Sequence, residues 1–123
     1  MNNKNTITIE CLKRHPELAI FLHKKLWNWL ADNPNKWNAD WPLWKTNGGC
    51  VEMMIGYDVI CSQTPGVCEN CMLKWSNHPD GNCFKLSPSQ PHSGLRYRYM
   101  HTRNPLKRKQ LAQAIANLPL KNK

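Results

Sequence analysis

Apolar residues recur at three- and four-residue steps near the start of the chain, which is the spacing of one face of a helix. The residues of this stripe are Leu18, Phe21, Leu22, Leu26, Trp29 and Leu30. Pro16 suits the first turn of a helix, where a missing N–H costs no hydrogen bond, and Asn33-Pro34 is typical of a helix end. The pattern therefore predicts a helix from Pro16 to about Asn33, with Trp27 beside the stripe and the aromatic residues packed in the core.

A second helix is predicted near the end of the chain. Asn104 has the side chain of a typical N-cap, and Pro105 fits the first helical position. The helix should continue to about Asn117 and end before Pro119. Its expected buried side consists of Leu111, Ala114, Ile115 and Leu118.

The chain between these two predicted helices has no long periodic stretch. Asn35 to Gly49 is rich in Pro, Asn and Gly, which favours an irregular segment whose indoles fold back over the first helix. Val51 to Ile60 is apolar but short, so it is read as a strand or a turn. In residues 95–103 cations alternate with aromatic residues, and a strand there would place Arg96, Arg98 and Met100 opposite Tyr97, Tyr99 and His101.

These elements predict an α-rich small zinc-stabilised domain with little sheet. A chain of 123 residues is long enough for one domain with a modest core, which a bound metal ion would help to stabilise. We divide this single domain, residues 1–123, into an N-terminal helical part (1–34), a Trp- and Cys-rich metal-binding part (35–94) and a basic strand or helix end (95–123).

Four cysteines lie within 23 residues and form the most specific motif of the chain. Cys68 and Cys71 are a C-x2-C pair, which places two thiolates on one tight turn. Cys61 lies seven residues before this pair and Cys83 twelve residues after it. Four thiolates hold zinc in structural sites, whereas a catalytic zinc keeps one position for water. The expected cofactor is therefore one structural zinc ion bound by these four residues.

Other ligand sets and other uses of the cysteines remain open. Cys50, Asp58 and His78 are alternative zinc ligands, because Asp58 stands three residues before Cys61 and His78 lies close to Cys83. The competing interpretations of the cluster are disulfides, an iron–sulfur cluster and unliganded thiols.

The start of the chain bears on this choice. Residues 1–13 are polar and lack the apolar core of a secretory leader, so we expect a cytoplasmic protein whose thiols stay reduced. A clustered cysteine pattern then favours a metal over disulfides. Cys11, which is far from the cluster in sequence, is expected to be a small buried apolar side chain.

The excess positive charge is confined to the last third of the chain. Residues 1–80 contain eight Lys/Arg and eight Asp/Glu, whereas residues 81–123 contain nine Lys/Arg and no carboxylate, so the net charge of +9 lies there. This asymmetry favours a polyanionic partner, most often nucleic acid, and the competing interpretation is a solvated basic tail. The cations expected to contact phosphates are Arg96, Arg98, Arg103, Lys107, Arg108 and Lys109.

The sequence contains no recognisable catalytic motif. A glycine-rich phosphate loop, an H-E-x-x-H pair and a nucleophile elbow are all missing, and the five histidines are scattered. His23 lies beside the first apolar stripe and is interpreted as packed or exposed rather than catalytic. We therefore do not expect an enzyme. No apolar run approaches 18 residues, so we expect no membrane span.

Two stretches resemble a group of small uncharacterised proteins encoded by phages and prophages. Leu22 to Lys36 reads LHKKLWNWLADNPNK, and Asp40 to Trp44 reads DWPLW. The group is similar in having a His/Trp helix, then a W-P segment, then a cysteine cluster, and in closing with a helix like the one that Asn104-Pro105 begins here. The resemblance implies a phage protein in the host cytoplasm, and it implies no established activity.

The cysteine cluster of that group is usually C-x2-C-x6-C-x2-C, and this chain departs from it at one position. Cys61, Cys68 and Cys71 match the last three cysteines, and Asp58 stands where the first would be. The resemblance would make Asp58 the fourth ligand, whereas the chemistry of structural zinc favours Cys83, because a thiolate holds zinc better than a lone carboxylate.

Two classes of function follow from these observations. The first is a zinc-binding protein that associates with nucleic acid through its basic C-terminal third. The alternative is a protein-binding module with a role in host interaction or anti-defence, one that inhibits or redirects a host or defence complex, for example of the CRISPR type. An acidic DNA mimic is excluded by the sign of the charge.

Overall fold

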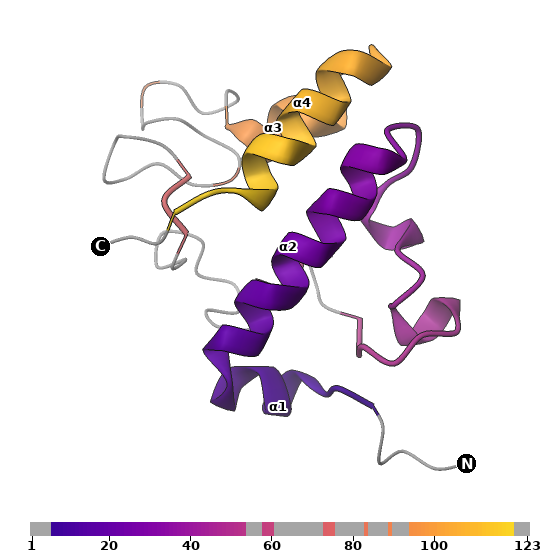
Figure 1. Cartoon of the computed structure of the whole chain (residues 1–123), viewed down its shortest axis with the longest axis vertical. Coiled ribbons are helices and arrows are strands. Elements are labelled where there is room, and N and C mark those ends of the chain that lie inside the picture. The colour runs from indigo at the N-terminus through magenta and orange to yellow at the C-terminus, as the bar shows by residue number, and fades with distance from the viewer. Residues whose placement is uncertain are drawn as a thin grey trace.

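The computed structural model describes residues 6–53, 58–60, 73–75, 83, 89 and 94–119, and the structural statements below concern these residues (Figure 1). In chain order the helices are α1 (Ile9–Arg14), α2 (Pro16–Asp32), the 3-10 helices η2 (Asn38–Asp40) and η3 (Lys45–Asn47), α3 (Leu95–His101) and α4 (Pro105–Ala116). Of the described residues 61% are helical and none lies in a strand, which confirms an α-rich domain with little sheet.

Helix α2 confirms the helix predicted from the first apolar stripe. It begins with Pro16 in its first turn and ends at Asp32, where the N–H of Asn33 donates to the carbonyl of Leu30 (3.1 Å). The buried side of α2 is rotated relative to the predicted stripe. Trp27, predicted to lie beside the stripe, is buried against Tyr99 of α3, whereas Phe21, predicted to lie within it, is 57% exposed. The buried residues of α2 are Ala19, Leu22, His23, Leu26, Trp27, Leu30 and Ala31.

Helix α4 begins as its cap sequence predicts. The Asn104 side chain accepts hydrogen bonds from the N–H groups of Leu106 (2.9 Å) and Lys107 (3.1 Å). Of the four residues predicted to be buried, Ile115 is buried, Leu111 and Leu118 are half-buried, and Ala114 is exposed. The side that faces α2 instead carries Arg108, Ala112, Ile115 and Ala116. The small alanines at four-residue spacing let the two helix backbones approach closely.

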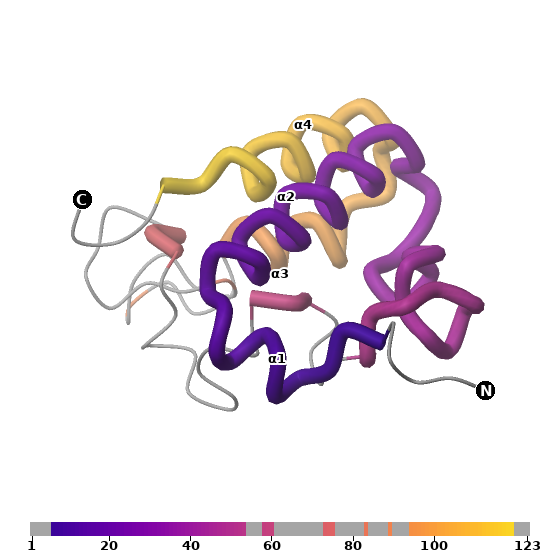
Figure 2. The backbone as a smooth tube through the Cα atoms, turned by 60° about the horizontal axis from the view of Figure 1, so that its bottom comes forward, coloured from indigo at the N-terminus to yellow at the C-terminus, as the bar shows by residue number. Residues whose placement is uncertain are grey.

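Helices α2 and α4 run antiparallel and lie side by side along most of α4 (Figures 1 and 2). Lys109 Nζ of α4 donates to the carbonyl of Ala31 at the C-terminal end of α2 (3.4 Å). Lys24 Nζ of α2 donates to the carbonyl of Ala116 at the C-terminal end of α4 (3.1 Å). Each helix thus places a cation at the negative end of the other helix dipole, which favours this antiparallel pairing.

Residues 95–101 form helix α3, so the strand considered for this stretch is corrected to a helix. The segment contains no β-branched residue, and its Leu, Arg and Met favour helix. The N–H groups of Arg96 and Tyr97, in the first turn, donate to the carbonyl of Cys83 (2.9 and 3.3 Å). As a helix, α3 turns Arg96 and Tyr99 inward, and the Tyr99 ring meets the edge of Trp27 at a centroid distance of 5.2 Å.

The segment between α2 and Val51 is irregular, as predicted, and it contains η2 and η3. Trp41 and Trp44 belong to the buried core and meet edge to face at 5.1 Å, while Trp37 stays 44% exposed. The segment folds back so that the N–H of Val51 donates to the carbonyl of Leu43 (2.8 Å). A side chain at Gly49 would lie 2.3 Å from the Leu43 backbone, so only glycine permits this return.

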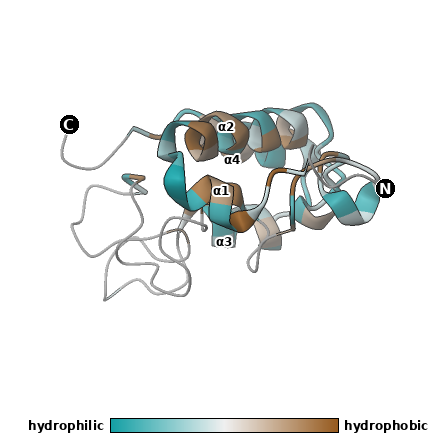
Figure 3. Cartoon of the chain, turned by 90° about the horizontal axis from the view of Figure 1, so that it is seen from below, coloured by the Kyte–Doolittle hydropathy of each residue, from teal (hydrophilic) through white to brown (hydrophobic). Residues whose placement is uncertain are grey.

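The core is built mainly from side chains of the helices and of the irregular segment. In Figure 3, hydrophobic and hydrophilic residues alternate around α1 and α2, as expected for helices with one buried side. Leu12 of α1, Leu26 of α2, Trp44 and Ile115 of α4 all belong to one cluster. Strand pairing in the described part of the chain is limited to isolated bridges, such as those that Ile7 and Trp44 make with Val51.

Candidate functional site

The expected zinc ligands lie mostly outside the described residues. Cys61, Cys68, Cys71 and the alternative ligand His78 are not among them, whereas Cys83 is described and is buried. Within the described residues no three His, Cys, Asp or Glu side chains converge on one point. The alternative ligand Cys50 is exposed, and Cys11, expected to be buried, is half-buried.

The described residues around the cysteine motif are attached to the helices at three places. Asp58, Val59 and Ile60 are buried immediately before Cys61. In residues 73–75, Leu73 and Trp75 are buried and the N–H of Lys74 donates to the carbonyl of Pro119 (2.8 Å). The carbonyl of Cys83 accepts the first N–H groups of α3, as described above. The described residues before the motif, within it and at its last cysteine thus contact the helical part of the chain or the residues that follow α4.

Asp58 lies at the centre of a buried polar network. Its Oδ1 accepts hydrogen bonds from the N–H of Ile60 (3.1 Å) and from Nδ1 of His23 (2.9 Å). Its Oδ2 accepts from the indole Nε1 of Trp27 (2.8 Å) and lies 3.1 Å from the same His23 nitrogen. Each carboxylate oxygen therefore has two donors around it, which leaves Asp58 poorly placed to bind a metal ion.

Burial by itself raises the pKa of the Asp58 carboxyl, because it removes water from the charged form. The positive charge of His23, the hydrogen bonds from His23 and Trp27 and the charge of Arg96 outweigh burial, so the pKa lies below its usual value. Asp58 is therefore ionised at neutral pH. A buried carboxylate of this kind is stable only with its donors in place.

The protonation state of His23 follows from its two neighbours. Its Nε2 lies 3.0 Å from the carbonyl oxygen of Ile115, which can only accept, so Nε2 carries a proton. Its Nδ1 faces the ionised Asp58, so Nδ1 donates as well. His23 is thus a positively charged imidazolium in a buried ion pair, and it also places a cation near the C-terminal end of α4.

A His–Asp pair is also the arrangement of a general base, and the geometry here argues for a structural role. His23 and Asp58 are each only 1% exposed, and both nitrogens of the imidazole are already hydrogen-bonded. A general base needs an unprotonated nitrogen within reach of a substrate proton. The pair instead joins α2, the Asp58–Ile60 segment and the end of α4.

The six cations expected to contact phosphates divide into two groups. Arg98, Arg103 and Lys107 are exposed, and Lys109 is half-exposed with Asp32 at 3.9 Å. Arg96 and Arg108 are 7% and 6% exposed, respectively, because their side chains turn into the core. Those two are therefore corrected from surface cations to buried ones.

Arg108 contacts two aromatic rings, those of Trp37 and Tyr99. Its guanidinium carbon lies 4.1 Å from the centroid of the Trp37 ring and 4.2 Å from that of the Tyr99 ring, within the range of cation–π contacts. Its Nη2 donates to the carbonyl of Lys36 (2.8 Å), which also accepts from the hydroxyl of Tyr99 (3.0 Å). Burial is the main cause that raises the pKa of Tyr99, so its hydroxyl stays protonated as a donor.

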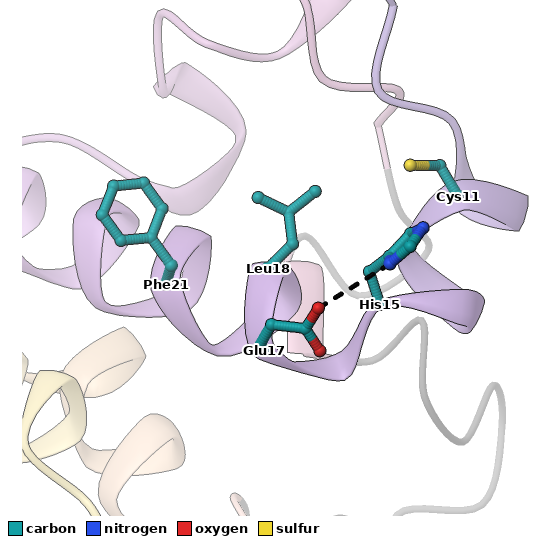
Figure 4. A pocket seen from close by; sticks show the side chains of 5 residues that line it. All are labelled: Cys11, His15, Glu17, Leu18 and Phe21. Carbon is teal, nitrogen blue, oxygen red and sulfur yellow. Dashed lines mark ion pairs between the residues drawn. The ribbon is translucent and has the colours of Figure 1, made fainter.

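A shallow hollow lies at the elbow between α1 and α2. It is lined by Cys11, His15, Glu17, Leu18 and Phe21, and Figure 4 shows the His15–Glu17 ion pair at its edge. That pair spans 3.7 Å and both side chains are more than half exposed. The hollow is therefore an apolar depression with a solvated rim.

Two features of the site were missed by sequence reasoning. Nothing in the order of residues pairs His23 with Asp58 or Arg108 with Trp37, because these partners lie 35 and 71 positions apart. One signal was available for the first pair. His23 sits among Ala19, Leu22 and Leu26 at helical spacing, which already indicates burial and hence the need for a buried partner.

Comparison of the chain with protein-family models, with curated proteins and with solved structures finds no match. None of the described helices is long and apolar enough to cross a membrane.

The buried ion pair predicts that Asp58→Asn destabilises the fold. Removing one partner of such a pair leaves the other charge buried without compensation, so we expect a loss of about 3 to 5 kcal/mol in unfolding free energy. Urea denaturation followed by circular dichroism measures this. Asp32→Asn, which changes an exposed carboxylate on α2, the helix that carries His23, is the control and should leave the midpoint nearly unchanged. Equal midpoints for the two variants would show that the pair is not stabilising.

The lowered pKa of Asp58 also predicts how stability depends on pH. Because the folded-state pKa is below the ordinary value of 3.8, the contribution of the carboxylate is complete above that pH and is lost as pH falls through the folded-state value. On the acid side, the excess stability of wild type over Asp58→Asn should therefore persist down to the ordinary value of 3.8 and fall below it. Loss of that excess already between about pH 5 and 3.8 would contradict the lowered pKa.

Proposed function

We propose that this protein associates with nucleic acid through the exposed cations at the junction of α3 and α4. Arg98 lies in the last turn of α3, Arg103 in the three-residue connection and Lys107 in the first turn of α4. All three are exposed and lie within one helical turn of the junction. This concentration of cations is the observation that carries the proposal, because phosphate contacts supply most of sequence-independent nucleic-acid affinity.

The neighbourhood of the junction supports a net positive surface. Lys36 is exposed, and its carbonyl is bound by Arg108 of α4, so its position next to α4 is fixed. Two carboxylates lie at the same end: Asp32 is near Lys109, and Asp40 accepts from the N–H of Trp37. Lys109 is therefore partly neutralised, and Arg98, Arg103 and Lys107 are the strongest candidates for phosphate contact.

We also propose that one structural zinc ion is bound by Cys61, Cys68, Cys71 and Cys83. The support is the C-x2-C spacing together with the burial of Cys83 and the saturation of the alternative ligand Asp58 by its own hydrogen bonds. Such an ion would link the cysteine motif across a stretch that is attached to the helices on both sides. Its binding free energy would contribute directly to folding.

The phosphate contacts predict a specific salt dependence. The triple variant Arg98→Ala, Arg103→Ala, Lys107→Ala should bind all sequences more weakly and lower the slope of log K against log salt by about two to three, since each phosphate contact contributes about 0.7 to 0.9. Fluorescence anisotropy with labelled oligonucleotides over a salt series measures this. Folding should be nearly unchanged, because exposed cations contribute little to stability.

The matched control removes three exposed cations elsewhere, Lys13, Arg14 and Lys25. It lowers the net charge equally and should leave most of the slope intact. Equal losses in the two triple variants would mean that affinity reflects net charge rather than this junction. Nucleic acid that does not bind at low salt, together with a complex recovered from nuclease-treated host lysate, would favour the protein-binding alternative.

The zinc site predicts one equivalent of zinc in the purified protein. Cys71→Ser should lose most of the metal and lower the thermal midpoint, because it removes one of the four thiolates. Cys50→Ser, which changes an exposed thiol outside the motif, is the control and should keep full occupancy. Elemental analysis decides: a protein without zinc or iron, or full metal in Cys71→Ser, would refute the assigned ligand set.

A further inference from the structure

An exposed indole stands at the same end of the molecule as the basic junction. Trp37 follows α2 and is 44% exposed, although Trp27, Trp41 and Trp44 are fully or almost fully buried. Large aromatic side chains are usually buried in cores, so an indole that is exposed and also fixed in position indicates a contact surface. Three contacts fix it.

The first contact covers one face of the ring. The guanidinium carbon of Arg108, a residue that is 6% exposed, lies 4.1 Å from the Trp37 ring centroid. The same carbon lies 4.2 Å from the centroid of the Tyr99 ring. The Trp37 and Tyr99 rings also meet at a centroid distance of 6.4 Å and an interplanar angle of 87°. The exposed area of Trp37 therefore belongs to its other face and its edges.

The other two contacts fix the peptide unit that joins Lys36 to Trp37. The N–H of Trp37 donates to Oδ2 of Asp40 (2.9 Å), and the carbonyl of Lys36 accepts from Arg108 and Tyr99. A ring on a fixed backbone with one face covered has little conformational freedom left to lose when a ligand stacks on it.

From this geometry we propose that Trp37 is a stacking platform for an unpaired base, which makes single-stranded nucleic acid the ligand of the basic junction. The inference rests on the proposed function. Cations beside an exposed aromatic ring are the combination by which proteins bind single strands: the cations follow the phosphates, and the ring stacks on a base. Lys36 adjoins Trp37 in sequence, and Lys107 and Lys109 flank the arginine that supports its ring.

The positive charge around Trp37 distinguishes between the kinds of ligand that could cover this surface. A purely apolar partner would leave the exposed cations Lys36, Arg103 and Lys107 unpaired, whereas a single strand supplies both a base for the indole and phosphates for the cations. A duplex keeps its bases stacked inside the helix, so it can satisfy the cations and not the ring. The structure therefore predicts preference for single strands over duplexes of the same sequence.

The test compares ligands on the unchanged protein. Fluorescence anisotropy measures the affinity for a labelled single strand of about 12 nucleotides, for the same length of abasic backbone and for the matching duplex. The three ligands separate base stacking from phosphate contact. We expect the intact strand to bind about 5- to 150-fold more tightly than the abasic one, the range that corresponds to about 1 to 3 kcal/mol for one stacked base.

Variants then assign the preference to one side chain. Trp37→Ala should abolish the difference between intact and abasic strands and leave the salt slope unchanged, and Trp37→Phe should retain part of the difference. Phe21→Ala is the matched control, because Phe21 is an exposed aromatic residue about 16 Å along α2 from its C-terminal end. It should behave as wild type. Circular dichroism establishes that each variant is folded.

Each outcome decides one of the two proposals. If wild type binds intact and abasic strands equally, the stacking inference is overturned while nucleic-acid association stands. Binding of none of the three ligands refutes both. If Trp37→Ala does not fold, the comparison of ligands on wild type and on Trp37→Phe still decides, because neither depends on that variant.

Discussion

The buried ion pair of His23 and Asp58 is the interaction on which the rest of the structure depends. It joins three parts of the chain that are distant in sequence: helix α2, the Asp58–Ile60 segment before the cysteine motif, and the C-terminal end of α4. Two charges without water around them are tolerated only when their donors and acceptors are satisfied. The network meets this demand, because the carboxylate has a backbone donor, an imidazolium and an indole, and the imidazolium has two oxygen acceptors.

The elements whose ends are encoded by local chemistry could be predicted from the sequence. Pro16 and the Asn104-Pro105 cap define the starts of α2 and α4 through groups within a few residues. The helix from Leu95 to His101 was harder to predict from the sequence. Its alternation of cations and aromatic residues resembles a strand, and the helix is stabilised by the carbonyl of Cys83, which lies outside the segment. In such a short segment the helix propensity of Leu, Arg and Met is only a weak indicator, so it does not outweigh the alternation.

The sequence predicted which cations belong to the candidate site, but it did not predict which of them are exposed. The charge asymmetry pointed to residues 96–109, but burial divides those cations into different roles, and burial depends on packing partners far along the chain. Arg108 is surrounded by Trp37 and Tyr99, whereas its neighbour Lys107 faces solvent, although the two have the same charge. A guanidinium is planar, weakly hydrated and able to stack on aromatic rings, which makes arginine suitable for this buried position.

The long sequence separation between α2 and α4 has a consequence for the order of folding. The bond between His23 and the carbonyl of Ile115 spans 92 positions, so α2 cannot acquire its main packing partner until α4 has been synthesised. Until then the apolar side of α2, including Trp27, has no α4 to cover it. Helical proteins usually fold quickly because their contacts are local, and this topology departs from that rule. The nascent chain is therefore most exposed to aggregation and to chaperone binding during translation, before its final helix emerges.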